Sequence, residues 1–249
     1  MGRSARRGGA SSAAKPAASP PPPLFASRAP TLTRKPGLEA RAVGAGAWVV
    51  PGCLTPAECG LVLAAAEARG YEHATSRGPR HGEAPRSHSR AAFLDPAFAR
   101  ALWDATGLRD ALAGCGDERG PWAGLNPAMR AYRYDPGDVF GAHFDQSVRL
   151  DEFGAVTRLT FLCYLTGEGE GEGEGGGEGE GEGGGGGVVS VVGGETAFFR
   201  DCRAGARELF RVAPKRGDAL VFVHGDACLP HASLEVRRGV KVVLRSDVF

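Results

Sequence analysis

Long apolar runs are missing from this sequence. No stretch of about 18 apolar residues occurs, so we expect no membrane-spanning helix. Closely spaced cysteine pairs are missing as well, because none of the six cysteines belongs to a C-x-x-C pair. This argues against a structural zinc site and against the disulfide framework of a small secreted protein. We therefore expect a reducing compartment.

An excess of one charge is also missing, since 30 Lys and Arg balance 29 Asp and Glu to a formal net charge of +1. Two segments of opposite sign produce this balance. Residues 1–38 hold seven basic residues and no acidic one, and residues 167–187 hold seven glutamates. The other 190 residues are near neutral, which argues against a nucleic-acid-binding surface.

The basic segment, residues 1–38, is rich in Ala, Pro and Ser and lacks the apolar run of a secretory signal. Its composition fits either a plastid or mitochondrial transit peptide or a disordered basic tail of a cytoplasmic protein. The four prolines at 20–23 favour extended polyproline geometry. In both cases we expect this segment to stay outside the core.

The acidic segment, residues 167–187, consists only of Gly and Glu. It cannot bury apolar area, so we expect a disordered loop inserted into the folded part. Such a loop costs little stability because closure entropy grows only with the logarithm of its length. Without the two segments the chain is long enough for a single domain with a sizeable core.

Two helices are predicted by their capping residues. The first has Thr55 as N-cap, Pro56 at the first position, Glu58 closing a capping box and Gly70 as its stop. Its apolar positions at helical spacing are Leu61, Ala64 and Ala65.

The second helix begins after Asp95 and Pro96 and ends before Gly107. Its apolar face consists of Phe98, Leu102 and Trp103. The polar, Gly- and Pro-broken stretch between the two helices predicts a long loop. We expect its histidines, His81 and His88, to be exposed and assign them no role.

From Met129 onward the sequence predicts short strands that are β-branched or aromatic and separated by turns such as DPGD and KRGD. Seven segments fit this description: MRAYRY, VFGAHFD, TRLTFLCYL, ETAFF, ELFRVA, DALVFVH and VKVVLRSDVF. Cys163, inside the third, is expected to be a buried hydrophobe. The pattern favours a mainly β sandwich or barrel over residues 129–249, supported by a helical region over residues 39–128.

The segment VFGAHFD holds a candidate metal site. His143 and Asp145 are two residues apart, so on one strand they share a face and can bind one divalent ion together. Gly141, on the same face, would leave room for the ion. The other face, with Phe140, Ala142 and Phe144, is expected to belong to the core.

A third ligand must come from elsewhere, and His224 and His231 both lie in the C-terminal strands. Two histidines and one carboxylate form the facial triad of non-haem Fe(II) oxygenases. An oxygenase that uses 2-oxoglutarate also needs a basic residue for the far carboxylate of that cosubstrate. Lys241, ten residues after His231, and Arg245, on the same strand face, are the candidates. An arginine forms the better bidentate pair, so both remain open here.

Several stretches together resemble the prolyl 4-hydroxylase-like branch of the 2-oxoglutarate- and Fe(II)-dependent dioxygenases. They are YRYDPGDVFGAHFD, TRLTFLCYL, GGETAFF, KRGDALVFVHGDACLPH and GVKVVLRSDVF. The resemblance extends from about Asn126 to Phe249 and is looser over residues 49–112. It implies a double-stranded β-helix, or jelly roll, with iron held inside one mouth.

The resemblance implies a role for six residues. The iron ligands would be His143, Asp145 and His231. Lys241 would pair with the C5 carboxylate of 2-oxoglutarate, and Tyr134 and Tyr164 would line that pocket. Thr196, in GGET, is expected only to pack.

The implied reaction is hydroxylation of an unactivated C–H bond of a prolyl residue, with O2 consumed, succinate and CO2 released, and L-ascorbate as reductant. A non-prolyl or small-molecule substrate is the alternative. A non-catalytic barrel and a cupin-like metal protein without 2-oxoglutarate are disfavoured by the complete ligand set and by Lys241.

Overall fold

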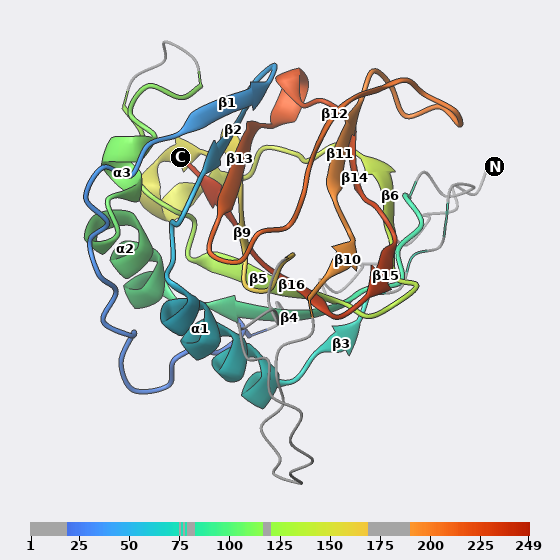
Figure 1. Cartoon of the computed structure of the whole chain (residues 1–249). Helices are drawn as coiled ribbons and strands as arrows, with labels where there is room; N and C mark the ends of the chain where they lie inside the picture. The colour runs from blue at the N-terminus through green and yellow to red at the C-terminus, as the bar shows by residue number, and fades with distance from the viewer. Residues whose placement is uncertain (1–18, 75, 77, 79–82, 117–120, 169–189) are drawn as a thin grey trace, which may run out of the picture.

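The computed structural model describes residues 19–74, 76, 78, 83–116, 121–168 and 190–249. These residues form a mainly β architecture in which a large and a small antiparallel sheet face each other and helices cover the outside of the large sheet (Figure 1). This arrangement is a jelly roll with helical supports, as the sequence predicts. No helix in the described part of the chain is long and apolar enough to cross a membrane.

The large sheet has eight strands in the order β1-β2-β13-β9-β16-β5-β4-β3. Their bounds are β1 Arg41–Gly44, β2 Ala47–Val50, β13 Ala219–Val223, β9 Leu159–Tyr164, β16 Lys241–Val248, β5 Ala128–Tyr134, β4 Ser89–Leu94 and β3 Glu72–His73. The small sheet has the order β12-β11-β14-β6. Its bounds are β12 Glu208–Val212, β11 Thr196–Phe199, β14 His231–Ser233 and β6 Phe140–His143. Two further pairs join β10 Val192–Gly193 to β15 Val236–Arg238 and β7 Arg149–Leu150 to β8 Ala155–Val156.

Side chains on the central strands point alternately to the two faces of the large sheet, which separates an outer apolar layer from an inner layer between the sheets. On β9, Leu159, Phe161 and Cys163 point to the main core beneath the helices. Leu162 and Tyr164 point the other way, into the space between the two sheets. This inner face carries the polar side chains described below, while the outer face supplies the apolar burial that holds the sheet to its helices.

The first helix, α1 Pro56–Arg69, begins as predicted, with Thr55 and Glu58 forming a capping box. Its expected apolar face is wrong, because Leu61 is 53% exposed and Ala64 is also exposed. The helix instead packs through a neighbouring stripe of positions, which consists of Cys59, Val62 and Ala66. Because alanines occur on both faces of this helix, the sequence does not distinguish its buried face from its exposed face.

The second helix, α2 Pro96–Ala105, confirms its prediction. The Asp95 side chain accepts a hydrogen bond from the backbone N–H of Phe98, and Gly107 follows the helix with a φ of +96°. The buried positions are Phe98, Ala99, Leu102 and Trp103. A short helix, α3 Leu108–Ala111, follows.

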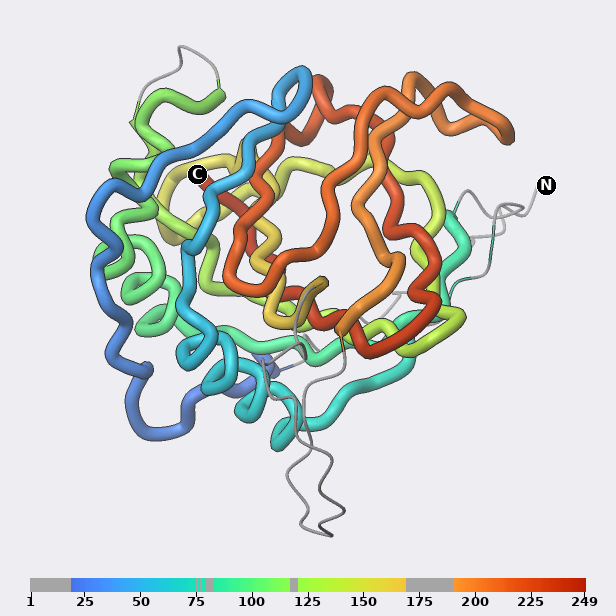
Figure 2. The backbone as a smooth tube through the Cα atoms, in the orientation of Figure 1, coloured from blue at the N-terminus to red at the C-terminus, as the bar shows by residue number. Residues whose placement is uncertain are grey.

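The expectation that residues 1–38 stay outside the core is wrong for their described part. Residues 19–38 run past the helices on the outside of the molecule (Figure 2), and Leu24 and Leu32 are buried in the main core. The Lys35 ammonium lies 2.6 Å from the Glu58 carboxylate, which ties this segment to the first turn of α1. Residues 1–18 lie outside the described part.

The large sheet also takes strands from the region expected to be helical. The expected loop ends earlier than predicted, because Ser89 and Arg90 already belong to β4. Ala91 and Phe93 of this strand alternate into the core, and the strand pairs with β5. The Gly/Glu tract lies outside the described residues except for its first two. Gly167 accepts a hydrogen bond from the Val191 N–H at 3.1 Å, so the two chain ends flanking the tract lie together.

Candidate active site

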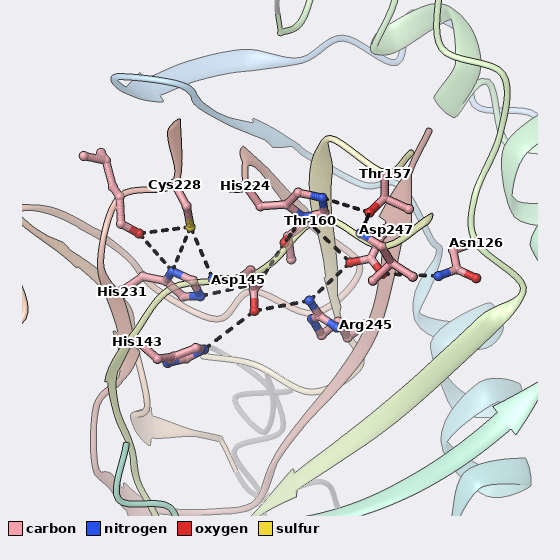
Figure 3. Close-up of polar contacts among 12 residues, drawn as sticks. Asn126, His143, Asp145, Thr157, Thr160, His224, Cys228, His231, Arg245 and Asp247 are labelled. Carbon is pink, nitrogen blue, oxygen red and sulfur yellow. Dashed lines mark hydrogen bonds and ion pairs between the residues drawn. The ribbon is translucent and has the colours of Figure 1, made fainter. Parts of the chain in front are cut away.

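His143, Asp145 and His231 converge at one end of the small sheet. One ligand atom from each lies within 4.8 Å of the others, which is a spacing suited to one metal ion. His143 ends β6 and His231 begins β14, and the two residues are directly opposite across this strand pair. The Nε2 atoms of His143 and His231 lie 3.9 Å and 3.6 Å from the Asp145 carboxylate (Figure 3).

Asp145 reaches this position differently from the prediction, because β6 ends at His143 and Asp145 is not on the strand. Beyond the strand, its backbone carbonyl accepts a hydrogen bond from Gly225, and its N–H lies 3.4 Å from the Cys228 sulfur. The turn before β14 therefore positions the carboxylate.

The role expected for Gly141, leaving room for the ion, is also wrong. A Cβ at this position would lie 2.8 Å from Pro85, so the glycine leaves room for the Pro85 ring.

Both histidine rings are oriented by backbone carbonyls. His143 Nδ1 lies 2.9 Å from the Gly141 oxygen and His231 Nδ1 lies 3.1 Å from the Leu229 oxygen. Donation from Nδ1–H to these carbonyls leaves the Nε2 lone pairs facing Asp145. Burial lowers the pKa of His143 to about 4 and lowers the pKa of His231 as well. Both rings are therefore neutral at pH 7, the form that binds metals.

The core face expected for Phe140 and Phe144 is only partly present, because Phe140 packs against a small buried cluster that includes Tyr134 whereas Phe144 does not. The Phe140 ring stacks on the His143 ring, with centroids 3.7 Å apart and an angle of 10° between the planes. It also lines the cavity in front of the three ligands, whereas Phe144 is 47% exposed. Phe140 therefore limits the motion of a candidate ligand.

Asp145 is held by a buried polar network that the sequence did not reveal (Figure 3). Arg245 Nη2 lies 3.2 Å from Asp145 and also 3.2 Å from Asp247. The Thr160 hydroxyl donates to the other Asp145 oxygen at 2.7 Å. Although burial alone would raise the Asp145 pKa, Arg245 and the two neighbouring histidines hold this pKa well below its usual range.

His224, the alternative third ligand, belongs to that network and not to the converging group. Its ring nitrogens lie 3.0 Å from the Thr157 and Thr160 hydroxyls. Both nitrogens are therefore engaged, and the geometry favours His231 over His224.

Lys241 lies in the same cavity as the three converging residues and is 2% exposed. Its ammonium donates to the Gly194 carbonyl at 2.5 Å and to the Ser233 hydroxyl at 2.8 Å. No carboxylate of a described residue lies within ion-pair distance of it. Burial lowers its pKa to about 7, and Glu195 opposes this shift only from a longer distance. A buried cation with only neutral partners suits an anionic ligand. Arg245, the other candidate, is already paired with two carboxylates.

Tyr134 and Tyr164 flank Lys241, with ring centroids 4.9 Å and 5.8 Å from its nitrogen. Both tyrosines are buried, and the Tyr164 hydroxyl is 2.9 Å from the Thr196 hydroxyl. Thr196 therefore does more than pack, since it fixes Tyr164 and lines the cavity. Tyr134 and Lys241 thus line the same cavity, whereas Tyr164 lies beside Lys241 but is not a lining residue.

The prediction for His88 is wrong. It is 1% exposed and packs against Tyr132, Tyr134 and Phe140, with ring centroids about 5 Å apart. Burial lowers its pKa to about 4, so it is a neutral member of the aromatic wall behind the cavity. His81 lies outside the described residues.

Comparisons with known proteins agree with this fold. A model of the 2OG-Fe(II) oxygenase superfamily matches residues 129–246. The viral collagen prolyl hydroxylase vCPH from Paramecium bursaria Chlorella virus-1, solved with 2OG, is 18% identical, covers 82% of this chain and 95% of its own, and superposes with a TM-score of 0.53. A comparison with curated proteins gave no match.

Two further solved structures share the fold. A 2OG-Fe(II) oxygenase family oxidoreductase from Burkholderia pseudomallei is 12% identical, with coverage of 82% and 85% and a TM-score of 0.51. A prolyl hydroxylase from Trichoplax adhaerens, in complex with a peptide fragment of hypoxia inducible factor, is 14% identical, with coverage of 81% and 83% and a TM-score of 0.50. At these identities the likeness concerns the fold.

Proposed function

We propose that the chain, whose residues 129–246 match the model of the 2OG-Fe(II) oxygenase superfamily, is a 2-oxoglutarate-dependent dioxygenase that hydroxylates a prolyl residue of a peptide or protein. One observation carries the site assignment. A single cavity contains two neutral histidines, one carboxylate and, apart from them, a buried lysine without an anionic partner.

In this proposal His143, Asp145 and His231 hold Fe(II). Their donor set is the two-histidine, one-carboxylate facial triad, which leaves open positions for cosubstrate and oxygen. Their Nε2 and carboxylate atoms already converge. Bound iron supplies the oxygen activation that couples decarboxylation of 2-oxoglutarate, giving succinate and CO2, to hydroxylation. The three candidate ligands are themselves kept in place by Gly141, Leu229 and Arg245.

Lys241 is proposed to pair with the C5 carboxylate of 2-oxoglutarate. An anion there would neutralise a cation that the fold leaves with neutral partners only. Tyr134 would form one wall of the pocket, and Leu162 and Val243 close its apolar side. Tyr164 would support the pocket from behind, through its hydrogen bond to Thr196. These residues position the cosubstrate and exclude water. L-Ascorbate is the expected reductant.

The prolyl target is supported by the sequence resemblance and by the names of two similar structures, both prolyl hydroxylases, one of them with a peptide. A non-prolyl or small-molecule substrate is the alternative. A non-catalytic barrel is disfavoured, since such a protein has no need for a buried lysine beside a complete ligand set.

The test is an assay of the purified full-length protein with Fe(II), 2-oxoglutarate, ascorbate and a pool of proline-containing peptides. We expect succinate and a peptide mass gain of one oxygen atom, both lost in His143→Ala. His73→Ala, which replaces an exposed histidine on β3, serves as the matched control. Absence of succinate with every peptide, or unchanged turnover in His143→Ala, would refute the proposal. Oxygen added only to residues other than proline would retain the reaction and replace the substrate.

A further inference from the structure

Two arginines extend the inner face of the large sheet beyond the cavity. Arg130 on β5 is directly opposite Arg245 on β16, and Arg90 on β4 is directly opposite Tyr132 on β5. Residues directly opposite each other in a sheet share a face. Tyr132 and Arg245 both line the cavity. Arg130 and Arg90 therefore lie on the face that leads away from the candidate iron ligands, across the adjacent strands of Figure 1.

Neither arginine is neutralised within the protein. Across the described residues, no carboxylate lies within ion-pair distance of the Arg130 or Arg90 guanidinium, and neither side chain makes a hydrogen bond. Glu72 is opposite Arg90 on the edge strand β3, but the two do not form an ion pair. Arg130 also faces Arg245, and like charges directly opposite each other destabilise a sheet. Arg245 is paired with Asp145 and Asp247, so the uncompensated charge is that of Arg130.

Binding of iron and cosubstrate does not remove this excess. Fe(II) and 2-oxoglutarate carry equal and opposite charges, so together they leave the electrostatic balance of the cavity unchanged. Arg130 is half-buried and Arg90 is exposed, so a ligand can reach both. The next molecule to enter the site therefore meets two free cations. Guanidinium groups bind carboxylates through paired hydrogen bonds.

We propose that Arg130 and Arg90 bind an acidic side chain of a peptide substrate and so select the sequence around the hydroxylated residue. This inference rests on the proposed dioxygenase function. Neighbouring strands are about 4.8 Å apart, so β5 and β4 lie about one and two strand spacings from Arg245, which contacts the candidate ligand Asp145. An extended peptide advances about 3.3 Å per residue. The acidic residue is therefore expected two or three positions from the target.

The decisive measurement is binding without turnover. Full-length protein loaded with Zn(II) in place of iron, and with 2-oxoglutarate, is titrated with fluorescent proline peptides that carry Glu at each of four positions on either side of the target. Matched peptides carry Gln or Lys at the same positions. We expect Glu two or three positions away to bind about tenfold more tightly than Gln, with this gain lost in high salt.

Three variants assign the effect to these side chains. Arg130→Gln and Arg90→Gln should each remove most of the preference for Glu over Gln, and Arg130→Glu should reverse it toward Lys. Arg100→Gln, an exposed arginine on α2 at the outer layer, is the matched control and should change nothing. Unchanged affinity for 2-oxoglutarate shows that each variant is folded.

Equal binding of Glu and Gln peptides to the wild type would overturn the inference, as would an equal loss for both peptides in Arg130→Gln. Oxidation of neutral peptides alone would overturn it and leave the proposed function standing. Tight, arginine-dependent binding of acidic peptides with no oxidised product in the iron-loaded protein would support it and count against the proposed function. Arginine-dependent binding of small dicarboxylates but of no peptide would overturn the choice of a peptide.

Discussion

Strand β16 carries two buried cations on its inner face, and their surroundings differ sharply. Lys241, at the start of the strand, contacts a carbonyl and a hydroxyl, both neutral. Arg245, four residues later, contacts two carboxylates. Removing a cation from water is costly unless an anion accompanies it. Arg245 has its anions in the fold, whereas Lys241 has none within ion-pair distance among the described residues, so the lysine end suits a ligand and the arginine end supports Asp145.

The largest expected effect comes from Asp145→Ala, which removes a candidate metal ligand and a partner of Arg245 together. We expect succinate formation to fall at least roughly 100-fold and Zn(II) binding to weaken strongly, because two histidines remain of the three ligands. Asp151→Ala, at an exposed carboxylate paired with Arg149, is the control and should retain activity. Normal turnover by Asp145→Ala would show that the metal lies elsewhere.

The two cations should also differ in their contribution to folding. Arg245→Leu leaves two buried carboxylates without their cation, so we expect the metal-free protein to lose about 3 kcal/mol of unfolding free energy. Added Zn(II) should restore part of this loss by neutralising Asp145. Lys241→Met removes a buried cation with no carboxylate of a described residue at ion-pair distance, so the free energy of unfolding should stay the same or rise.

Urea denaturation of both variants, with and without Zn(II), measures this contrast. A similar loss for the two substitutions would mean that Lys241 has an anionic partner in the folded protein. The comparison of the two ends of β16 would then fail.

Lys241→Ala tests by enzyme kinetics whether Lys241, at the start of β16, binds 2-oxoglutarate. We expect the KM for 2-oxoglutarate to rise at least about 10-fold, since a charge-assisted pair is lost, while Zn(II) affinity changes less than about threefold. Ser233→Ala removes only a neutral contact of the lysine and should have a smaller effect. Equal losses in cosubstrate and metal binding would show that the lysine has another role.

The smallest effect is a pH dependence. Burial lowers the pKa of Lys241 to about 7, below its value of about 10.5 in the unfolded chain. A bound carboxylate favours the charged lysine, so cosubstrate binding takes up a proton above pH 7. The Kd for 2-oxoglutarate should therefore rise with pH above 7, by no more than the increase in KM expected for Lys241→Ala. It should stay constant below 7 as far as Lys241 is concerned.

Lys241→Arg provides the matching control, because an arginine remains charged throughout this range and should flatten the profile. The lowered pKa of Lys241 also affects the stability of the folded protein. The unfolded chain binds more protons than the folded one between pH 7 and 10.5, so this lysine's destabilising contribution is fully present below pH 7 and is relieved as pH rises. A Kd that is unchanged between pH 7 and 9 in the wild type would contradict the assigned environment.

Local signals predicted much of this molecule. The caps of both helices, the strands after Met129 and the three converging residues were recognisable, because capping and alternation depend on near neighbours. The position of Asp145 was not, since it lies past the end of β6 and is held by a turn about 80 residues away in sequence. Its spacing from His143 was informative even though the assumed strand geometry was wrong.

Several of the errors share one cause, which is burial by distant segments. His88 and Leu24 occur in polar or Pro-rich surroundings, yet aromatic rings and the main core cover them. Thr160 and Asp247 carry no recognisable motif, and only the pairing of β9 with β16 places them beside each other near Asp145. Long-range contacts of this kind leave no periodic pattern in a single sequence.

The position of β16 has a consequence for how the chain is made. It lies between β9 and β5 in the large sheet, yet it is synthesised after the other seven strands of that sheet. Until it emerges, β9 and β5 each present an unpaired edge, the kind of surface that recruits other chains. Newly made chains are therefore most prone to aggregate just before the segment with Lys241 and Arg245 is synthesised. The strand that completes the candidate site also covers the two open strand edges.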